Sequence, residues 1–180
     1  MTSKSLFQRP DLMPIGEAAE AVAKSFFNTL PLEKPPIDVR HDPKWQAKKV
    51  DYLLPLKGGG MEYAEVKSDR HIAFKGNALF ETLRIHHTAQ TCAYLGWSVV
   101  SLSQKIYVWC PPAQRLFVYR TRDLQRGMQE YTQRTRGAMR LAIVETDATR
   151  TTINILVPLQ YVPHRIYRFA KQWELVKETT

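Results

Sequence analysis

The chain has 180 residues, which is the usual size of a single domain and is long enough to bury a core of its own. Its formal net charge of +9 favours a polyanionic partner such as nucleic acid. No apolar run is long enough to span a bilayer, and the N-terminal residues lack the apolar stretch of a secretory signal. Cys92 and Cys110 have no zinc-site or disulfide-framework spacing. We therefore expect a cytoplasmic protein with no membrane partner and one domain over residues 1–180.

The first expected element is a helix from Ile15 to Leu30, preceded by a polar segment at residues 1–13 that we expect to be flexible. Apolar residues recur in it at helical spacing, at Ile15, Ala19, Val22, Phe26 and Leu30. Prolines at positions 31, 35 and 36 end the helix. A short strand at residues 37–40 and a polar loop at residues 41–49 then lead to Asp51.

The next segment predicts a β-hairpin. Two short apolar runs, at residues 50–54 and 63–67, flank three glycines at positions 58–60. Glycine adopts positive φ without steric cost, so the three glycines are a turn signal. A turn centred on Gly59 would place Asp51 opposite Lys67.

The residues that suggest chemistry lie on this hairpin. Asp51 begins the first strand. Glu65 and Lys67 share one face of the second strand, because residues i and i+2 of a strand point the same way, while Ala64 and Val66 point into a core. Two carboxylates and one ammonium would therefore converge at a strand end, where hard oxygen ligands suit Mg²⁺.

Downstream of the hairpin we expect a basic loop at residues 68–76 and then several strands, at residues 78–83, 97–100, 106–110, 116–119 and 153–157. Residues 86–96 fit either a loop or a short helix. A helix is expected to begin at Thr121 and run toward Tyr131, and residues 161–176 include a mixed basic and aromatic tail. This order predicts an α/β or α+β domain with a central mixed sheet.

Phosphodiester hydrolysis requires a water that is nucleophilic near neutral pH and a cation that absorbs charge in the transition state. Asp51 and Glu65 could bind such a cation, Mg²⁺ or alternatively Mn²⁺, and the backbone carbonyl of Val66 is a further candidate ligand. Lys67 would orient or deprotonate the attacking water, or neutralise the developing charge. The alternative is an aspartate that ends a strand beside a solvated Glu65–Lys67 pair.

Asp51, the glycine turn and Glu65-Val66-Lys67 resemble the PD-(D/E)xK nuclease superfamily, and the resemblance extends from about residue 15 to residue 125. The chain looks like the small phage and bacterial members. The resemblance implies the restriction-endonuclease-like fold, with a central mixed β-sheet flanked by helices, and a magnesium-dependent nuclease activity. One departure from the family pattern is that no proline precedes Asp51.

The family often adds an acidic residue on its first helix, and the sequence offers two. Glu17 lies nearly opposite the apolar stripe of the helix, whereas Glu20 lies nearer its edge, so we prefer Glu20 as a catalytic residue. Glu81, in the third expected strand, either lies near the site or belongs to the polar face of an alternating strand.

Basic residues on both sides of the proposed site are candidates for contacts with the DNA backbone. They are Lys48 and Lys49 before Asp51, and Arg70, His71 and Lys75 after Lys67. Two further basic groups, at residues 115–140 and 164–171, are expected to be solvated faces.

The function predicted from the sequence is a metal-dependent endodeoxyribonuclease that acts on DNA. One rival is a Holliday-junction resolvase or recombination nuclease with the same site. The other is a non-catalytic nucleic-acid-binding module of the same fold. A homodimer is compatible with the main prediction, because cutting both strands of a duplex commonly takes two active sites.

Overall fold

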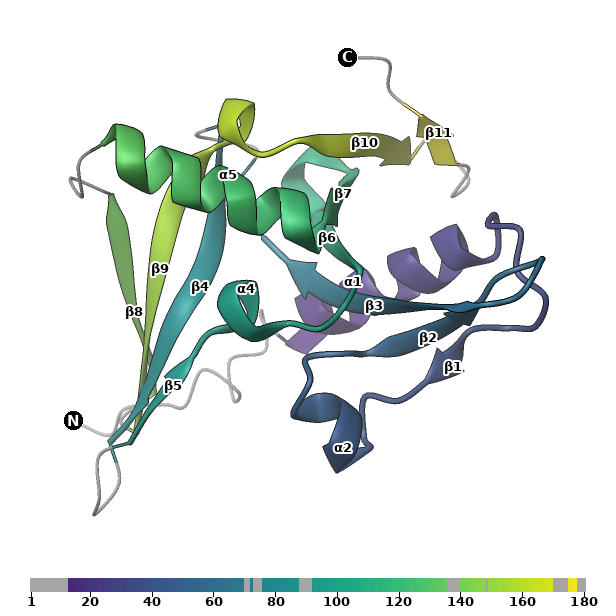
Figure 1. The fold of residues 1–180 in the computed structure, drawn as a ribbon, viewed down its shortest axis with the longest axis horizontal. Coiled ribbons are helices and arrows are strands. Elements are labelled where there is room, and N and C mark those ends of the chain that lie inside the picture. The colour runs from purple at the N-terminus through teal and green to yellow at the C-terminus, as the bar shows by residue number, and fades with distance from the viewer. Residues whose placement is uncertain are drawn as a thin grey trace.

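The computed structural model describes residues 13–69, 72, 76–87, 92–135, 140–147, 149–169 and 175–177. In this part of the chain two β-sheets lie side by side with helices packed against them, which is a mixed α/β arrangement (Figure 1). Residues 1–12, which the sequence predicted to be flexible, lie outside the described residues. So do Arg70, His71 and Lys75 of the predicted basic loop.

The larger sheet has the strand order β1-β2-β3-β6-β7-β10-β11. These strands span Ile37–Asp38, Tyr52–Pro55, Met61–Ser68, Lys105–Cys110, Arg115–Arg120, His164–Phe169 and Leu175–Lys177. β3 and β6 run parallel, whereas the other neighbours run antiparallel. The expected central mixed sheet is therefore confirmed.

Helices cover both faces of this sheet. α1 (Met13–Phe27) packs against one face, where Ala19, Val22 and Phe26 of its predicted apolar stripe are buried with Tyr52 and Tyr107. α5 (Thr121–Arg134) covers the opposite face. Burial of this apolar stripe, rather than helix propensity alone, stabilises α1 in its place.

The smaller sheet packs on the α5 side and was not expected as a separate unit. Its order is β5-β4-β9-β8, all antiparallel, with bounds Cys92–Leu95, Asn77–His86, Arg150–Pro158 and Leu141–Asp147. The sequence predicted parts of β4 and β9 but neither β5 nor β8. In β8 the side chains of Leu141 and Ile143 are exposed, so these two apolar residues do not mark a buried face.

Two expectations about local structure were wrong. Residues 97–100 form the short helix α4 (Trp97–Val100) rather than a strand, since the N–H groups of Val99 and Val100 donate to the Gly96 carbonyl. The Trp97 ring packs against Phe80, and this tertiary contact outweighs the strand preference of the valines.

The predicted polar loop at residues 41–49 contains the short helix α2 (Pro43–Gln46). The Asp42 carboxylate accepts the N–H of Lys44, and Pro43 occupies the first turn, where its missing N–H costs nothing. The short 3₁₀ helix η2 (Pro111–Ala113) connects the neighbouring strands β6 and β7, and η3 (Leu159–Tyr161) connects β9 of the smaller sheet to β10 of the larger one.

The predicted basic and aromatic tail is part of the larger sheet, because β10 pairs with β7 over His164 to Arg168. Among the described residues, no helix is long and apolar enough to cross a membrane.

Candidate active site

The turn of the β2–β3 hairpin is built from glycines. Gly58, Gly59 and Gly60 have φ of 90°, 90° and 96°, a region that side-chain-bearing residues rarely adopt. The register pairs Tyr52 with Ala64, so the hairpin is centred on Gly58 rather than on Gly59 as expected. Asp51 consequently lies beside Ala64 and Glu65, and the expectation that it faces Lys67 across the strands was wrong.

Asp51 sits at a local irregularity of the hairpin. Its backbone N–H donates to the Ala64 carbonyl at 2.8 Å, although the register assigns Ala64 to Tyr52. Two residues of one strand thus oppose one residue of the other, as in a β-bulge, which commonly re-aims a side chain near a functional site. At this irregularity the Asp51 side chain replaces a backbone carbonyl as the hydrogen-bond acceptor, since its Oδ2 accepts the N–H of Val66 at 2.7 Å.

The carbonyl of Val66 points to this same edge, because the N–H and C=O of one strand residue lie on the same side of the strand. The Val66 carbonyl therefore lies along the same strand edge as the Asp51 carboxylate, and its assignment as a metal ligand stays a prediction.

Glu65 is an unusual buried acid. Only 1% of the residue is exposed, and alternation along β3 places it on the face opposite Ala64 and Val66. Its carboxylate contacts the Lys67 ammonium, whose Nζ lies 2.8 Å from Oε1, and the Ser101 side chain is a second hydrogen-bonding partner. Burial raises the pKa of the Glu65 carboxyl above its ordinary value.

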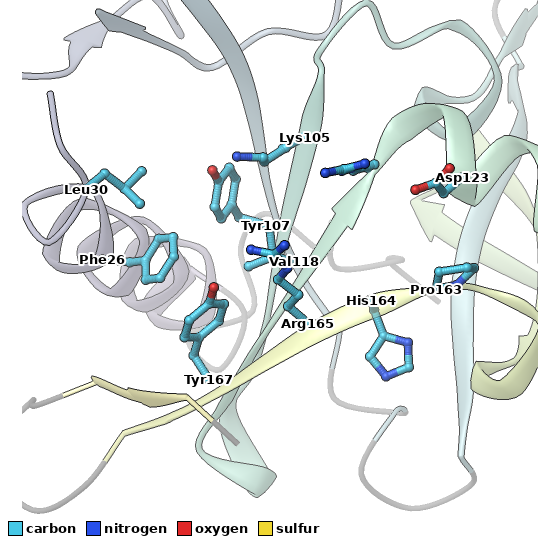
Figure 2. A pocket seen from close by; sticks show the side chains of 11 residues that line it. Phe26, Leu30, Lys105, Tyr107, Val118, Asp123, Pro163, His164, Arg165 and Tyr167 are labelled. Atoms are coloured by element: carbon cyan, nitrogen blue, oxygen red, sulfur yellow. The ribbon is translucent and has the colours of Figure 1, made fainter. Parts of the chain in front are cut away.

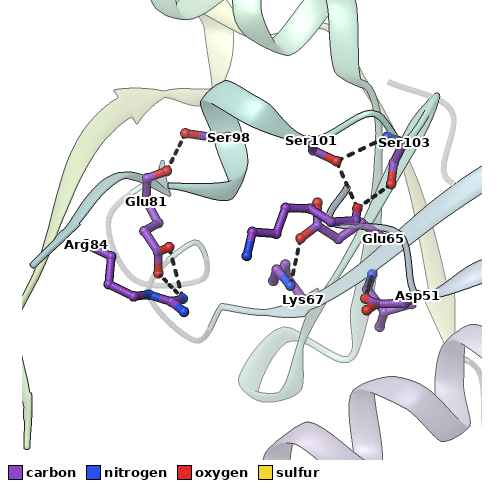
Figure 3. A network of polar contacts seen from close by, with 10 residues as sticks. Asp51, Glu65, Lys67, Glu81, Arg84, Ser98, Ser101 and Ser103 are labelled. Carbon is purple, nitrogen blue, oxygen red and sulfur yellow. Dashed lines mark hydrogen bonds and ion pairs between the residues drawn. The ribbon is translucent and has the colours of Figure 1, made fainter. Parts of the chain in front are cut away.

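Lys67 is held between acids. Figure 3 shows its side chain with Asp51 on one side and Glu81 on the other. Burial opposes its charge, but the carboxylates of Glu65, Asp51 and Glu81 outweigh burial and hold the pKa of the Lys67 ammonium above its ordinary value. In the protein as it stands, Lys67 is thus a cation at neutral pH.

Glu81 enters the group from the smaller sheet. Both of its carboxylate oxygens contact Nη2 of Arg84, at 3.0 and 2.9 Å, and its own backbone carbonyl accepts the Ser98 hydroxyl at 2.6 Å. The pairing of β4 with β9 shifts register between Glu81 and Leu83, so a second strand irregularity lies next to the site. Of the two alternatives for Glu81, the structure supports the one near the site.

Lys49 lies in the turn that precedes Asp51 and has an unusual backbone conformation. It adopts a left-handed φ of 55°, which costs about 1 kcal/mol for a residue with a side chain. Its carbonyl accepts the hydroxyls of Ser101 at 3.1 Å and Ser103 at 2.7 Å, so the linker before β6 fixes the turn that delivers Asp51. With Glu81 and Arg84, Lys49 lines a pocket of about 240 Å³. The Lys48 ammonium instead lies over the Trp45 ring.

The structure does not bring Glu20 into this group. Its carboxylate forms an ion pair with Arg40, which also binds Asp38. α1 packs on the face of the sheet that carries Ala64 and Val66, opposite Glu65 and Lys67. Glu17 is exposed, as its position on the helix predicted.

The side chains at this site meet some of the requirements for binding a magnesium ion. Asp51 and Glu65 offer two carboxylates, each with lone pairs beyond those that its present partners occupy. Mg²⁺ usually keeps several waters and binds through one or two carboxylates. Within the described ranges, however, no group of three or more acidic, histidine or cysteine side chains could hold a metal.

Ser101 and Ser103 are site residues that the sequence did not indicate, since serines in a linker carry no pattern of their own.

Comparisons with protein-family models, with curated proteins and with solved structures gave no match.

Replacement of Glu65 by glutamine should change how stability depends on pH. Because the pKa of Glu65 is raised in the folded chain, folding favours its protonated form. The wild type should therefore lose stability relative to Glu65→Gln as the pH rises from the ordinary carboxyl pKa of 4.5 through the raised folded value. Lys67 stays protonated over this range, since its pKa is also raised. Urea unfolding of both proteins between about pH 4 and about pH 8 measures the difference, and a difference independent of pH would contradict the assignment.

Proposed function

We propose that the protein is a metal-dependent endodeoxyribonuclease with a restriction-endonuclease-like core. The observation that carries the proposal is the meeting of Asp51, Glu65 and Lys67 at the end of the β2–β3 hairpin. A buried carboxylate whose charge is balanced by one ammonium is costly for a fold to maintain. A catalytic site gives a reason for that cost.

The arrangement of elements supports the fold part of the proposal. α1 packs on a mixed sheet in which the hairpin carries the acids and β6 runs parallel to the strand of Glu65 and Lys67. The connection from β3 to β6 differs from a simple helical crossover, because it runs through β4, β5 and α4. This connection delivers Glu81, Ser101 and Ser103 to the site.

Asp51 and Glu65 would hold a magnesium ion, with the Val66 carbonyl as a further ligand. The ion, when bound, supplies Lewis-acid stabilisation of the phosphate and a water of lowered pKa. Lys67, as a cation, holds a phosphate oxygen or the attacking water and neutralises developing charge. A role for Lys67 as the base would require loss of its proton, which the three surrounding carboxylates oppose.

The test is cleavage of supercoiled plasmid, linear duplex and a four-way junction, with Mg²⁺ or Mn²⁺ and with a chelator as control. Metal-dependent cutting of plasmid and linear duplex supports the proposal. Cutting of the junction alone would favour the Holliday-junction resolvase over the proposed nuclease.

A non-catalytic nucleic-acid-binding module is the second candidate, and the absence of a group of three or more possible metal ligands among the described residues favours it. Salt-sensitive DNA binding without cleavage of any substrate would identify that module.

A further inference from the structure

A second pocket lies on the other face of the larger sheet. Its volume is about 370 Å³, within the range of about 300–1,000 Å³ typical of small-molecule sites. Tyr107 and Val118 in its lining belong to the core under α1, whereas Glu65 and Lys67 occupy the opposite face of the sheet. This pocket is therefore separate from the candidate active site.

One side of the pocket is apolar and aromatic. Figure 2 shows Phe26 of α1, and Leu30 just beyond the end of that helix, facing Tyr107 of β6 and Tyr167 of β10. The Phe26 ring centroid lies 4.7 Å from that of Tyr167 and 5.7 Å from that of Tyr107. Phe26 and Tyr107 are buried beneath this side, so the partly exposed side chains of Tyr167 and Leu30 form the surface against which a flat, partly apolar group can lie.

The other side gathers positive charge. The register places Lys105 directly opposite Arg120, and it places Arg165 opposite Val118, two residues from Arg120 along β7. Since alternate residues of a strand share a face, all three cations lie on the pocket side of the sheet. Like charges directly opposite in antiparallel strands are destabilising.

Only part of this charge is compensated. Nζ of Lys105 lies 2.6 Å from Oε2 of Glu62. Arg120 and Arg165 are both exposed, and neither forms an ion pair with any residue that the structure describes. Asp123 is the acid in the pocket lining. Two arginines on neighbouring strands, beside a side of the pocket that carries Tyr167 and Leu30, suit an anion that carries a ring.

We propose that this pocket binds a nucleoside phosphate, with the phosphate held by Arg120 and Arg165 and the base against the aromatic side. Guanidinium groups bind phosphate through paired, charge-assisted hydrogen bonds. The ligand is either a free nucleotide or the phosphorylated end of a nucleic-acid strand, which present the same chemistry. The proposal extends beyond the nuclease proposal, because it concerns a different face of the sheet.

The test is isothermal titration calorimetry with adenosine 5′-monophosphate as the probe. A chelator is present so that metal-dependent cleavage does not contribute to the measured heat. We expect one binding site per chain and at least about tenfold weaker binding of adenosine. Arg120→Gln and Arg165→Gln should each weaken binding of the probe by about tenfold to a hundredfold. The matched control is Arg122→Gln, which changes an exposed arginine next to the pocket but outside its lining.

The inference is overturned if wild type does not bind the probe at millimolar concentration, or if Arg122→Gln weakens binding as much as Arg120→Gln does. Repetition in the Asp51→Asn variant separates the two proposals, since this substitution leaves the pocket intact whether or not the protein is a nuclease. Unchanged nucleotide binding in that variant is the expected result, and its loss would argue that the two sites are not separate.

A competition experiment distinguishes the two sources of the ligand. Displacement of the probe by a 5′-phosphorylated oligonucleotide, but not by the same oligonucleotide with a 5′-hydroxyl, supports a strand end. Displacement by neither, together with binding of the probe, supports a free nucleotide. Equal displacement by both would overturn the proposal, because internal phosphates would then be the group that binds.

Discussion

Asp51→Asn and Lys67→Met are each expected to reduce metal-dependent DNA cleavage by about a hundredfold to a thousandfold, the usual effect of losing one preorganised charge-stabilising group. The amide oxygen introduced by Asp51→Asn would still accept the N–H of Val66, so this substitution removes a charge while retaining the hydrogen bond at 2.7 Å. Plasmid cleavage measured under single-turnover conditions gives the rate. Either variant cutting as fast as wild type would refute the site assignment.

The control for charge is Lys57→Met, at an exposed lysine of the same hairpin, which should cut at the wild-type rate. Folding needs a separate control, because removal of Lys67 leaves the buried Glu65 carboxylate without its counterion. That loss should cost about 1–3 kcal/mol of stability. The double variant Glu65→Gln/Lys67→Met removes both charges, so it should recover much of this stability and remain inactive. Recovery of activity together with stability would show that the ion pair is structural only.

Under the nuclease proposal, the Lys67 ammonium balances the charge of the buried Glu65 carboxylate through Oε1 and leaves lone pairs of that carboxylate for a divalent cation.

The sequence predicted the hairpin and the face of its second strand because both follow from local rules. Alternation places Glu65 and Lys67 together, and glycine supplies the turn. The exact register did not follow, since three glycines with positive φ allow more than one turn centre and the bulge at Asp51 depends on how the chain leaves α2. A one-residue slip was enough to change the residue that faces Asp51.

The contacts of the site between residues far apart in the chain could not be predicted from the sequence. Ser101 and Ser103 bind the carbonyl of Lys49 across about fifty positions of the chain, and Glu81 reaches Lys67 from a different sheet. Glu20 was expected at the site because family resemblance places an acid on the first helix. In this chain Arg40 binds it, and no helical pattern could have predicted that partner.

Gly96→Ala is expected to destabilise the protein by about 3 kcal/mol, because overpacking against an immobile backbone is among the costliest single changes. A Cβ at position 96 would lie 2.2 Å from the carbonyl oxygen of Glu81 and 2.5 Å from its carbonyl carbon. That carbonyl is fixed by the Ser98 hydroxyl, and the Gly96 N–H is bound to Thr82, so neither side can withdraw easily. The φ of Gly96 is −71°, which alanine adopts without strain, so the effect is steric alone.

Two other glycines separate this steric effect from the general consequences of replacing glycine. Gly16→Ala, in α1 with nothing within 4 Å of the new Cβ, should leave stability unchanged or raise it by about 0.5–1 kcal/mol. Gly58→Ala also has open space, but its φ of 90° should cost about 1 kcal/mol. Urea unfolding midpoints should therefore fall in the order Gly16→Ala, Gly58→Ala, Gly96→Ala. Because Glu81 contributes to the field that holds Lys67 charged, Gly96→Ala should also slow cleavage under conditions in which the variant remains folded. A Gly96→Ala protein with the wild-type unfolding midpoint would show that the contact between α4 and β4 is not as close as the structure describes.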